Sequence, residues 1–249
     1  MSRRWVKPSL GRRLMADLSW VSLRVPRCLM RARLHIPRAL AARAALAAPR
    51  PPWTTLFVKG FGLAAEARPA LRRCHATLPW PWMLEMEHAL GCVILEGEHA
   101  GEPMVAIARF AGCHATPLPE LARRLNEAKN GPAEASQSFR QFRRFALLPW
   151  PLRRLLLRLG LACGWPMVRW GGTFAVSSLG AQDALILDSV STLPVFLSYG
   201  PIGADGGVDV AIAFDHRVMD GADGAAALRG LEHALEGALA DELLALGRG

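Results

Sequence analysis

Lysine and paired cysteines are scarce in this chain. Only three of its 30 basic residues are lysines, an arginine bias that we attribute to coding composition rather than to chemistry. The five cysteines form an odd set without any Cys-x-x-Cys pair, which indicates small buried thiols in a reducing compartment and no zinc motif. They are Cys28, Cys74, Cys92, Cys113 and Cys163.

Long uncharged apolar runs are missing as well. No stretch of about 18 or more such residues occurs, so no membrane-spanning helix is predicted. The basic N-terminus is not followed by an apolar segment with a small-residue cleavage site, so no secretory signal is predicted. We therefore expect a cytoplasmic protein and leave open whether it touches a membrane surface.

The composition is that of a folded, basic globule. Hydrophobic residues make up 51% of the 249 residues and charged residues 20%, which excludes a disordered chain. The net charge of +9 favours anionic partners such as coenzyme A, an acyl-carrier protein or anionic lipid. Nucleic acid is not expected as a partner, because the arginines are scattered and no recognition motif accompanies them.

Helical and strand patterns intermix along the chain, which predicts a single α+β sandwich rather than a doubly wound fold. Residues 1–10 are predicted to form a basic arm and residues 11–249 one domain. Gly91 and residues 97–103 are interpreted as hairpin turns, and Thr116 as an N-cap. The predicted helices cover residues 12–23, 37–48, 54–66, 117–129 and 221–246, the third with a polar face at Lys59 and Glu66 and the last with a break near Gly237. The predicted strands cover residues 28–36, 82–88, 92–98, 104–110, 173–178, 193–199 and 208–214.

A histidine after the last predicted strand is the strongest functional signal. His216 stands where this strand bends into an alanine-rich helix, and Asp220 follows four residues later. Such a bend can aim an imidazole into a cleft, where it deprotonates a thiol, hydroxyl or amine. Ser177 and Ser178 supply hydroxyls on a second predicted strand. Because His216 and Asp220 have no evident third partner, no metal site is expected.

Two motifs in this sequence resemble those of a known family. They are Gly172-Thr173-Phe174-Ala175-Val176-Ser177-Ser178-Leu179-Gly180 and Asp215-His216-Arg217-Val218-Met219-Asp220-Gly221. With the order of elements over most of the chain, they resemble the catalytic domain of the dihydrolipoamide acyltransferases of 2-oxoacid dehydrogenase complexes. That domain shares its fold with chloramphenicol acetyltransferase, so the resemblance implies a sandwich of a mixed β-sheet with flanking helices. It also implies a homotrimer with sites between adjacent subunits, and no tightly bound cofactor.

The resemblance also implies roles for three residues. His216 would be the general base, and Ser177 would donate a hydrogen bond to the oxyanion, with Ser178 as an alternative donor. Asp220 would be mainly structural, holding the histidine loop through an ion pair with Arg12 or Arg13. The acyl donor would be an acyl-CoA or an acyl-carrier protein.

Several features depart from the family. No lipoyl domain, subunit-binding domain or long linker is recognised, and Ser191-Thr192-Leu193-Pro194 replaces the family's usual turn. We therefore expect a stand-alone acyltransferase with a changed acceptor, and the acyl chain and the acceptor stay open. The alternative is a trimeric scaffold that has lost turnover. The presence of His216, Asp220 and Ser177 favours the enzyme, because a scaffold does not need them.

Residues 134–170 are expected to be an insertion of two basic amphipathic helices joined by a Pro-Trp-Pro corner at residues 149–151. Three roles are open for it: residues 139–165 lie on anionic lipid, the insertion packs across a trimer contact, or it covers an acyl tunnel. The glycine-rich residues 200–207 are interpreted as a hairpin loop rather than a phosphate cradle. The remaining histidines are taken as ordinary surface or core residues: His35, His75, His88, His99, His114 and His233.

Overall fold

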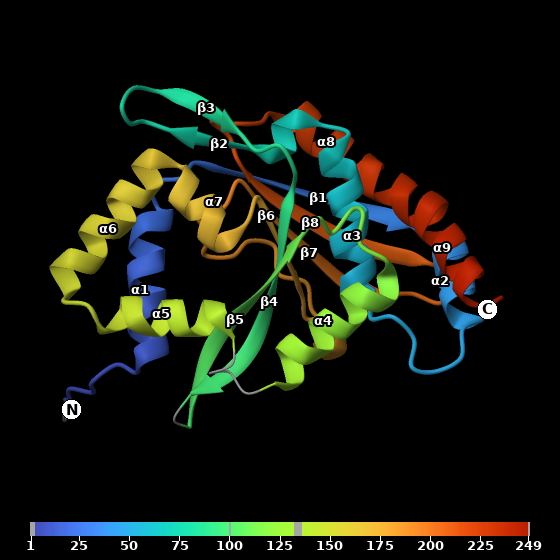
Figure 1. Ribbon diagram of the computed structural model, residues 1–249, viewed down its shortest axis with the longest axis horizontal. Helices are drawn as coiled ribbons and strands as arrows, with labels where there is room; N and C mark the ends of the chain where they lie inside the picture. Colours follow the sequence, from blue (N-terminus) through green and yellow to red (C-terminus); the bar gives the residue numbers. More distant parts are fainter. Residues whose placement is uncertain (1–2, 100, 132–135, 249) are drawn as a thin grey trace.

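A six-stranded mixed sheet forms the centre of the molecule (Figure 1). The computed structural model describes residues 3–99, 101–131 and 136–248. The strand order is β1-β8-β7-β6-β4-β5; β6 runs parallel to β4 and β7, and the other neighbours are antiparallel. The strands are β1 (Arg27–His35), β4 (Leu90–His99), β5 (Glu102–Ala111), β6 (Phe174–Ser178), β7 (Val195–Ile202) and β8 (Gly207–Asp215). The predicted α+β class is confirmed.

A separate two-stranded sheet corrects one prediction. Strand β3 (Trp82–Glu85) pairs with β2 (Arg73–Ala76) and not with the strand that follows it. Gly91, predicted as the turn between them, lies inside β4 opposite Phe110 and Phe174. A Cβ at Gly91 would stand 2.7 Å from Cζ of Phe174, so this glycine is explained by an aromatic ring packed on the strand.

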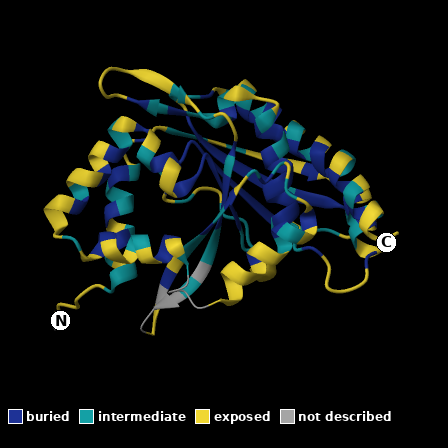
Figure 2. Ribbon diagram, viewed as in Figure 1, coloured by how far each residue is buried: buried dark blue, intermediate teal, exposed yellow. Residues whose placement is uncertain are grey.

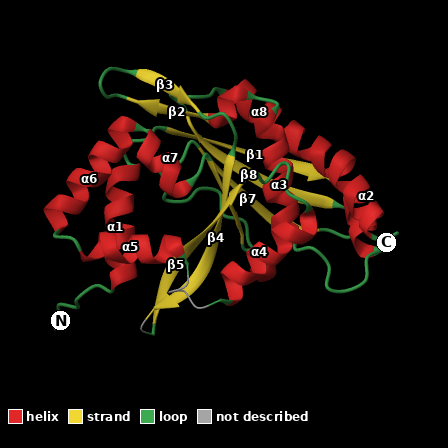
Figure 3. Ribbon diagram, in the orientation of Figure 1, coloured by secondary structure: helices red, strands yellow, loops and turns green. Residues whose placement is uncertain are grey.

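Five helices and a π-helical turn gather on one side of the central sheet (Figure 3). The fully buried rings of Phe57 and Phe61 on α3 lie in the same core cluster as Phe174 and Phe214 from the sheet, and this cluster is the main hydrophobic core (Figure 2). The predicted break near Gly237 is confirmed as the π-helical turn. The elements are α2 (Pro37–Ala44), α3 (Trp53–Glu66), α4 (Leu118–Asn130), α8 (Gly221–Ala234), the turn η4 (Leu235–Leu239) and α9 (Ala240–Leu246).

Two polar predictions on these helices are corrected. Lys59, assigned to a polar face of α3, is buried, and its Nζ lies 2.6 Å from Oε2 of Glu242 on α9. Thr116 does not cap α4, because its hydroxyl donates to the carbonyl oxygen of Gly112 and the N-cap is Pro117. The first correction comes from a contact between distant helices, and the second from a local hydrogen bond in the turn before α4.

A second group of helices lies beside β5 and β2: α1 (Leu10–Ser22), α5 (Gln137–Leu147), α6 (Trp150–Cys163) and α7 (Trp165–Gly171). The predicted pair of helices with a corner at Pro149 is confirmed, and α7 is an unpredicted third helix. A buried ion pair joins the insertion to α1, since Nε of Arg153 lies 2.6 Å from Oδ2 of Asp17. Residues 132–135 lie outside the described residues.

No described helix combines the length and the apolar character that crossing a membrane requires. The described residues also include two short 3₁₀ segments, η1 (Pro69–Arg72) before β2 and η3 (Gly180–Gln182) after β6. Residues 3–9 have no regular secondary structure, in agreement with an N-terminal arm.

Candidate active site

The loop that carries His216 is fixed by hydrogen bonds on both sides of the histidine. Asp215 is buried at the end of β8, and Arg217 folds back on it with Nε 2.9 Å from Oδ1 and Nη2 2.7 Å from Oδ2. The His216 backbone N–H donates to the carbonyl oxygen of Pro26 at 2.8 Å. The His216 side chain is exposed, so a rigid backbone presents the imidazole at the surface.

Asp220 has a structural role, but a different one from the predicted ion pair. Its Oδ1 accepts hydrogen bonds from the backbone N–H groups of Ala222 at 2.8 Å and Asp223 at 3.0 Å, which makes it the N-cap of α8. Within the described part of a single chain, Asp220 has no ion pair with Arg12 or Arg13. An aspartate N-cap both satisfies free N–H groups and complements the helix dipole.

Ser177 offers a hydroxyl that the chain itself does not use. The residue is buried on β6, and its Oγ has no hydrogen-bond partner among the described residues. Ser178, by contrast, donates to the carbonyl oxygen of Tyr199 at 3.0 Å and accepts from the backbone N–H of Gly180 at 3.1 Å. The two candidates are therefore distinguished: Ser178 builds the turn after β6, and Ser177 is available to a ligand.

Within one chain, Ser177 and His216 do not meet. Ser177 is in register with Ser198 on β7, and Ser198 is in register with Ala211 on β8. His216 follows Ala211 by five residues, so the two side chains are separated along the strands as well as across them. At about 3.3 Å per residue and about 4.8 Å per strand, the separation is roughly 20 Å.

The small sheet supplies neighbours of the His216 loop that the sequence did not reveal. Cys74 and His75 on β2 lie within electrostatic reach of the Asp215–Arg217 pair. Burial, followed by the charge of Asp215, raises the pKa of Cys74 to about 11. Burial and then the nearby Arg217 lower the pKa of His75. A strand of four residues is too short to give a periodic signal, which is why these neighbours were missed.

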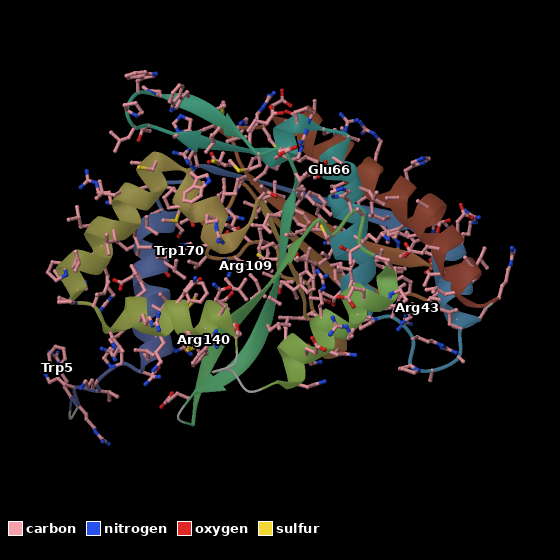
Figure 4. The ribbon with its side chains drawn as sticks, in the orientation of Figure 1. Trp5, Arg43, Glu66, Arg109, Arg140 and Trp170 are labelled. Carbon is pink, nitrogen blue, oxygen red and sulfur yellow. The ribbon has the colours of Figure 1, made fainter. Side chains whose placement is uncertain are left out.

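An apolar pocket of about 140 Å³ lies between the insertion and the face of the sheet that carries Ser177. Ala175, two residues before Ser177 and on the same face of β6, lines it together with Cys92 from β4. Trp170, labelled in Figure 4, and Phe145 close it from the insertion. Their ring centroids are 6.1 Å apart. The pocket therefore joins the insertion to the side of the sheet where the free hydroxyl lies.

Potential metal ligands do not gather around His216. Among the described residues, neither His216 nor Asp220 belongs to a group of three histidine, cysteine or carboxylate side chains close enough to share an ion. Such a group does occur elsewhere, at Glu66, His88 and His114.

Comparison with solved structures identifies the fold, whereas comparison with family models and with curated proteins gives no match. Solved structures do match, among them the dihydrolipoamide acetyltransferase of Azotobacter vinelandii, with a TM-score of 0.70, 16% identity, and coverage of 95% of this chain and 93% of that one.

Two further structures give the same result. A probable dihydrolipoamide acetyltransferase of Listeria monocytogenes has a TM-score of 0.65 and 16% identity, with 94% of each chain covered. The truncated catalytic core of the 2-oxoacid dehydrogenase complex of Thermoplasma acidophilum has a TM-score of 0.63 and 11% identity, covering 95% of this chain and 99% of that one. The chain has the fold of these acyltransferase cores, as its two motifs predicted.

Proposed function

We propose that this protein is an acyltransferase that moves an acyl group from a thioester to a thiol, hydroxyl or amine. Two separate observations support the proposal: a rigidly held, exposed imidazole at His216, and a hydroxyl at Ser177 without a hydrogen-bond partner among the described residues. Both stand on a chain with the fold of acyltransferase cores. The catalytic mechanism of the Azotobacter vinelandii enzyme involves a serine, a histidine and an asparagine four residues after that histidine. His216 and Asp220 have the same spacing here, with aspartate in place of asparagine.

The proposed mechanism assigns one step to each side chain. His216 removes the proton of the acceptor as the acceptor attacks the thioester carbonyl, which contributes about 10²–10⁴-fold. Ser177 donates a hydrogen bond to the developing oxyanion, which contributes about 10²–10³-fold. When the intermediate collapses, the C–S bond breaks and the leaving thiolate takes the proton from the imidazolium. Asp220 acts only through the position of α8 and its loop.

The separation of the two side chains supports a site shared between subunits. An oxyanion donor must lie within about 3 Å of the reacting oxygen, and roughly 20 Å within one chain is too far. We infer a homotrimer in which His216 of one subunit faces Ser177 of the next. The Thermoplasma neighbour is the catalytic core of a multienzyme complex, which is consistent with a chain that works as an assembly.

The donor is proposed to be an acyl-CoA or an acyl-carrier protein. Both are anionic, and the net charge of +9 favours their approach. Of the three roles that the sequence leaves open for residues 134–170, the apolar pocket supports the one in which they cover an acyl tunnel. Its apolar lining suits a hydrocarbon chain. Lipid contact by residues 139–165 stays a prediction. Exposed leucines on α6 (Leu152, Leu155, Leu156 and Leu159) mark the face on which to test it.

The proposal is tested by incubating purified protein with a panel of acyl-CoAs and measuring free thiol released in the presence of thiol, hydroxyl and amine acceptors. Turnover that requires an acceptor and saturates with donor is expected. A stable trimer that consumes no thioester from any donor, acyl-carrier protein included, would instead establish the scaffold alternative.

A further inference from the structure

Three side chains from separate segments converge away from the candidate active site. Glu66 ends α3 (Figure 4), His88 precedes β4, and His114 lies in the turn between β5 and α4. One potential ligand atom of each lies within 4.8 Å of the other two. Nδ1 of His88 is 3.2 Å from Oε2 of Glu66, and Nδ1 of His114 is 3.4 Å from Oε1.

Each of the two shorter distances is close to the separation of two ligand atoms on one metal ion, and the two imidazoles approach different oxygens of the carboxylate. Zinc binds histidine nitrogen and carboxylate oxygen at about 2.0–2.2 Å with tetrahedral geometry, which places two ligand atoms roughly 3.3 Å apart. Hydrogen bonding explains only part of the cluster. His88 makes a hydrogen bond to Glu66, but Nδ1 of His114 is buried and has no hydrogen-bond partner in the described chain. This nitrogen lies 3.4 Å from Oε1 of Glu66 without forming a hydrogen bond, so a cation held between the two atoms would give it a partner.

The cluster is held in place before any ion binds. The backbone N–H of Ala89 donates to Oε1 of Glu66 at 2.8 Å and orients the carboxylate. A Cβ at Gly62 would stand 2.6 Å from Sγ of Cys113 and 3.3 Å from the backbone nitrogen of His114, so α3 and the turn approach as closely as their backbones allow. Oriented ligands of this kind are typical of real metal sites.

The charges around the cluster are compatible with a cation. Glu66 supplies the one negatively charged side chain of the cluster. Arg72 is the nearby positive charge, and Glu87, 3.9 Å from Nε2 of His88, offsets it. The His88 side chain is 60% exposed, which leaves room for water on the ion.

We propose that Glu66, His88 and His114 bind one divalent transition-metal ion, with zinc as the best fit to a two-histidine, one-carboxylate set. Water completes the coordination. The ion ties the end of α3 to the start of β4 and to the turn after β5. The role of the ion is to hold these three segments together. The metal-site proposal does not depend on the acyltransferase proposal.

The test is calorimetric titration of ZnCl₂ into tag-free protein that has been treated with a chelator. Cys163→Ser is used as the background, because Cys163 is the one exposed cysteine among the described residues. One equivalent of zinc should bind at neutral pH. Glu66→Gln and His114→Ala should each weaken binding by more than the roughly 10–100-fold that loss of an outer-shell partner costs. His233→Ala, an exposed histidine on α8, is the matched control and should bind like the parent.

Thermal unfolding gives a second readout that does not depend on activity. At a zinc concentration about 100 times the Kd, the melting temperature should rise by about 5–10 °C in the parent and in His233→Ala. Glu66→Gln retains the size of the side chain, so it tests the ligand role if His114→Ala folds poorly. The absence of saturable zinc binding, or equal binding by the parent and Glu66→Gln, would overturn the proposal.

Discussion

The two faces of the central sheet differ in how densely their side chains are packed. On the face under α3 and α8, large side chains such as Phe61, Phe174 and Phe214 are fully buried against one another. On the opposite face, smaller residues such as Ala175 leave an apolar pocket, and Ser177 keeps a hydroxyl free. The first face is densely packed, whereas the second keeps an apolar pocket and a hydroxyl that is available to a ligand.

The largest expected effect is on activity alone. His216→Ala removes the base but leaves the Asp215–Arg217 pair and the backbone bond to Pro26 in place. Turnover should fall by about 10²–10⁴-fold or below detection, with an unchanged melting temperature. The measurement is thioester consumption beside thermal unfolding of the same preparation. Undiminished transfer would refute the mechanism.

A substitution on the densely packed face should affect stability rather than activity. Phe61 is fully buried, and its ring centroid is 4.8 Å from that of Phe174, so Phe61→Ala should cost about 3–5 kcal/mol in the free energy of unfolding. Phe142→Ala is the matched control, since Phe142 lines the pocket and its removal enlarges an existing space. Urea unfolding should show the smaller loss for Phe142→Ala. Equal losses in the free energy of unfolding would contradict the claim that one face of the sheet is more densely packed than the other.

Neighbouring serines give a sharper comparison within one strand. Ser177→Ala removes the proposed oxyanion donor and should lower kcat by about 10²–10³-fold. Ser178→Ala removes hydrogen bonds of the turn, worth about 1 kcal/mol each, and should keep activity within about tenfold. Steady-state kinetics on both variants decide the matter. A larger loss of kcat in Ser178→Ala than in Ser177→Ala would assign the role of oxyanion donor to Ser178.

The smallest expected effect concerns the pocket. Ile107 on β5 lines it, and Ile107→Trp should fill it, lowering the preference for longer acyl chains over acetyl by about tenfold or more. Leu23→Trp, at a position that is 86% exposed, is the control. Rates are compared across an acyl-CoA series. An unchanged dependence of the rate on acyl-chain length would show that the pocket does not hold the acyl chain.

Local signals predicted much of this molecule. The strand, the His216 loop and the helix that Asp220 begins follow from a continuous sequence pattern, and so do the insertion helices around Pro149. What could not be predicted depends on distant residues. Gly91 is explained only by the ring of Phe174, and the burial of Lys59 only by Glu242 on α9.

The same limit applies to sites. Ser177 and His216 were found because each belongs to a motif that can be recognised alone. Glu66, His88 and His114 come from three segments, and no spacing in the sequence relates them. The β2 strand, with Cys74 and His75, is too short to be detected by periodicity. The sequence therefore indicates candidate residues that belong to motifs, and the structure adds their distances and the candidates that no motif contains.

The shared site is the central claim, and a mixed trimer tests it most directly. His216→Ala and Ser177→Ala chains are mixed in equal amounts, unfolded and refolded together, and assayed beside each parent. In a ring of three with head-to-tail contacts, about one quarter of the sites combine an intact His216 with an intact neighbouring Ser177. The account predicts recovery towards about a quarter of wild-type activity. A mixture no more active than the better of its two parents would contradict it.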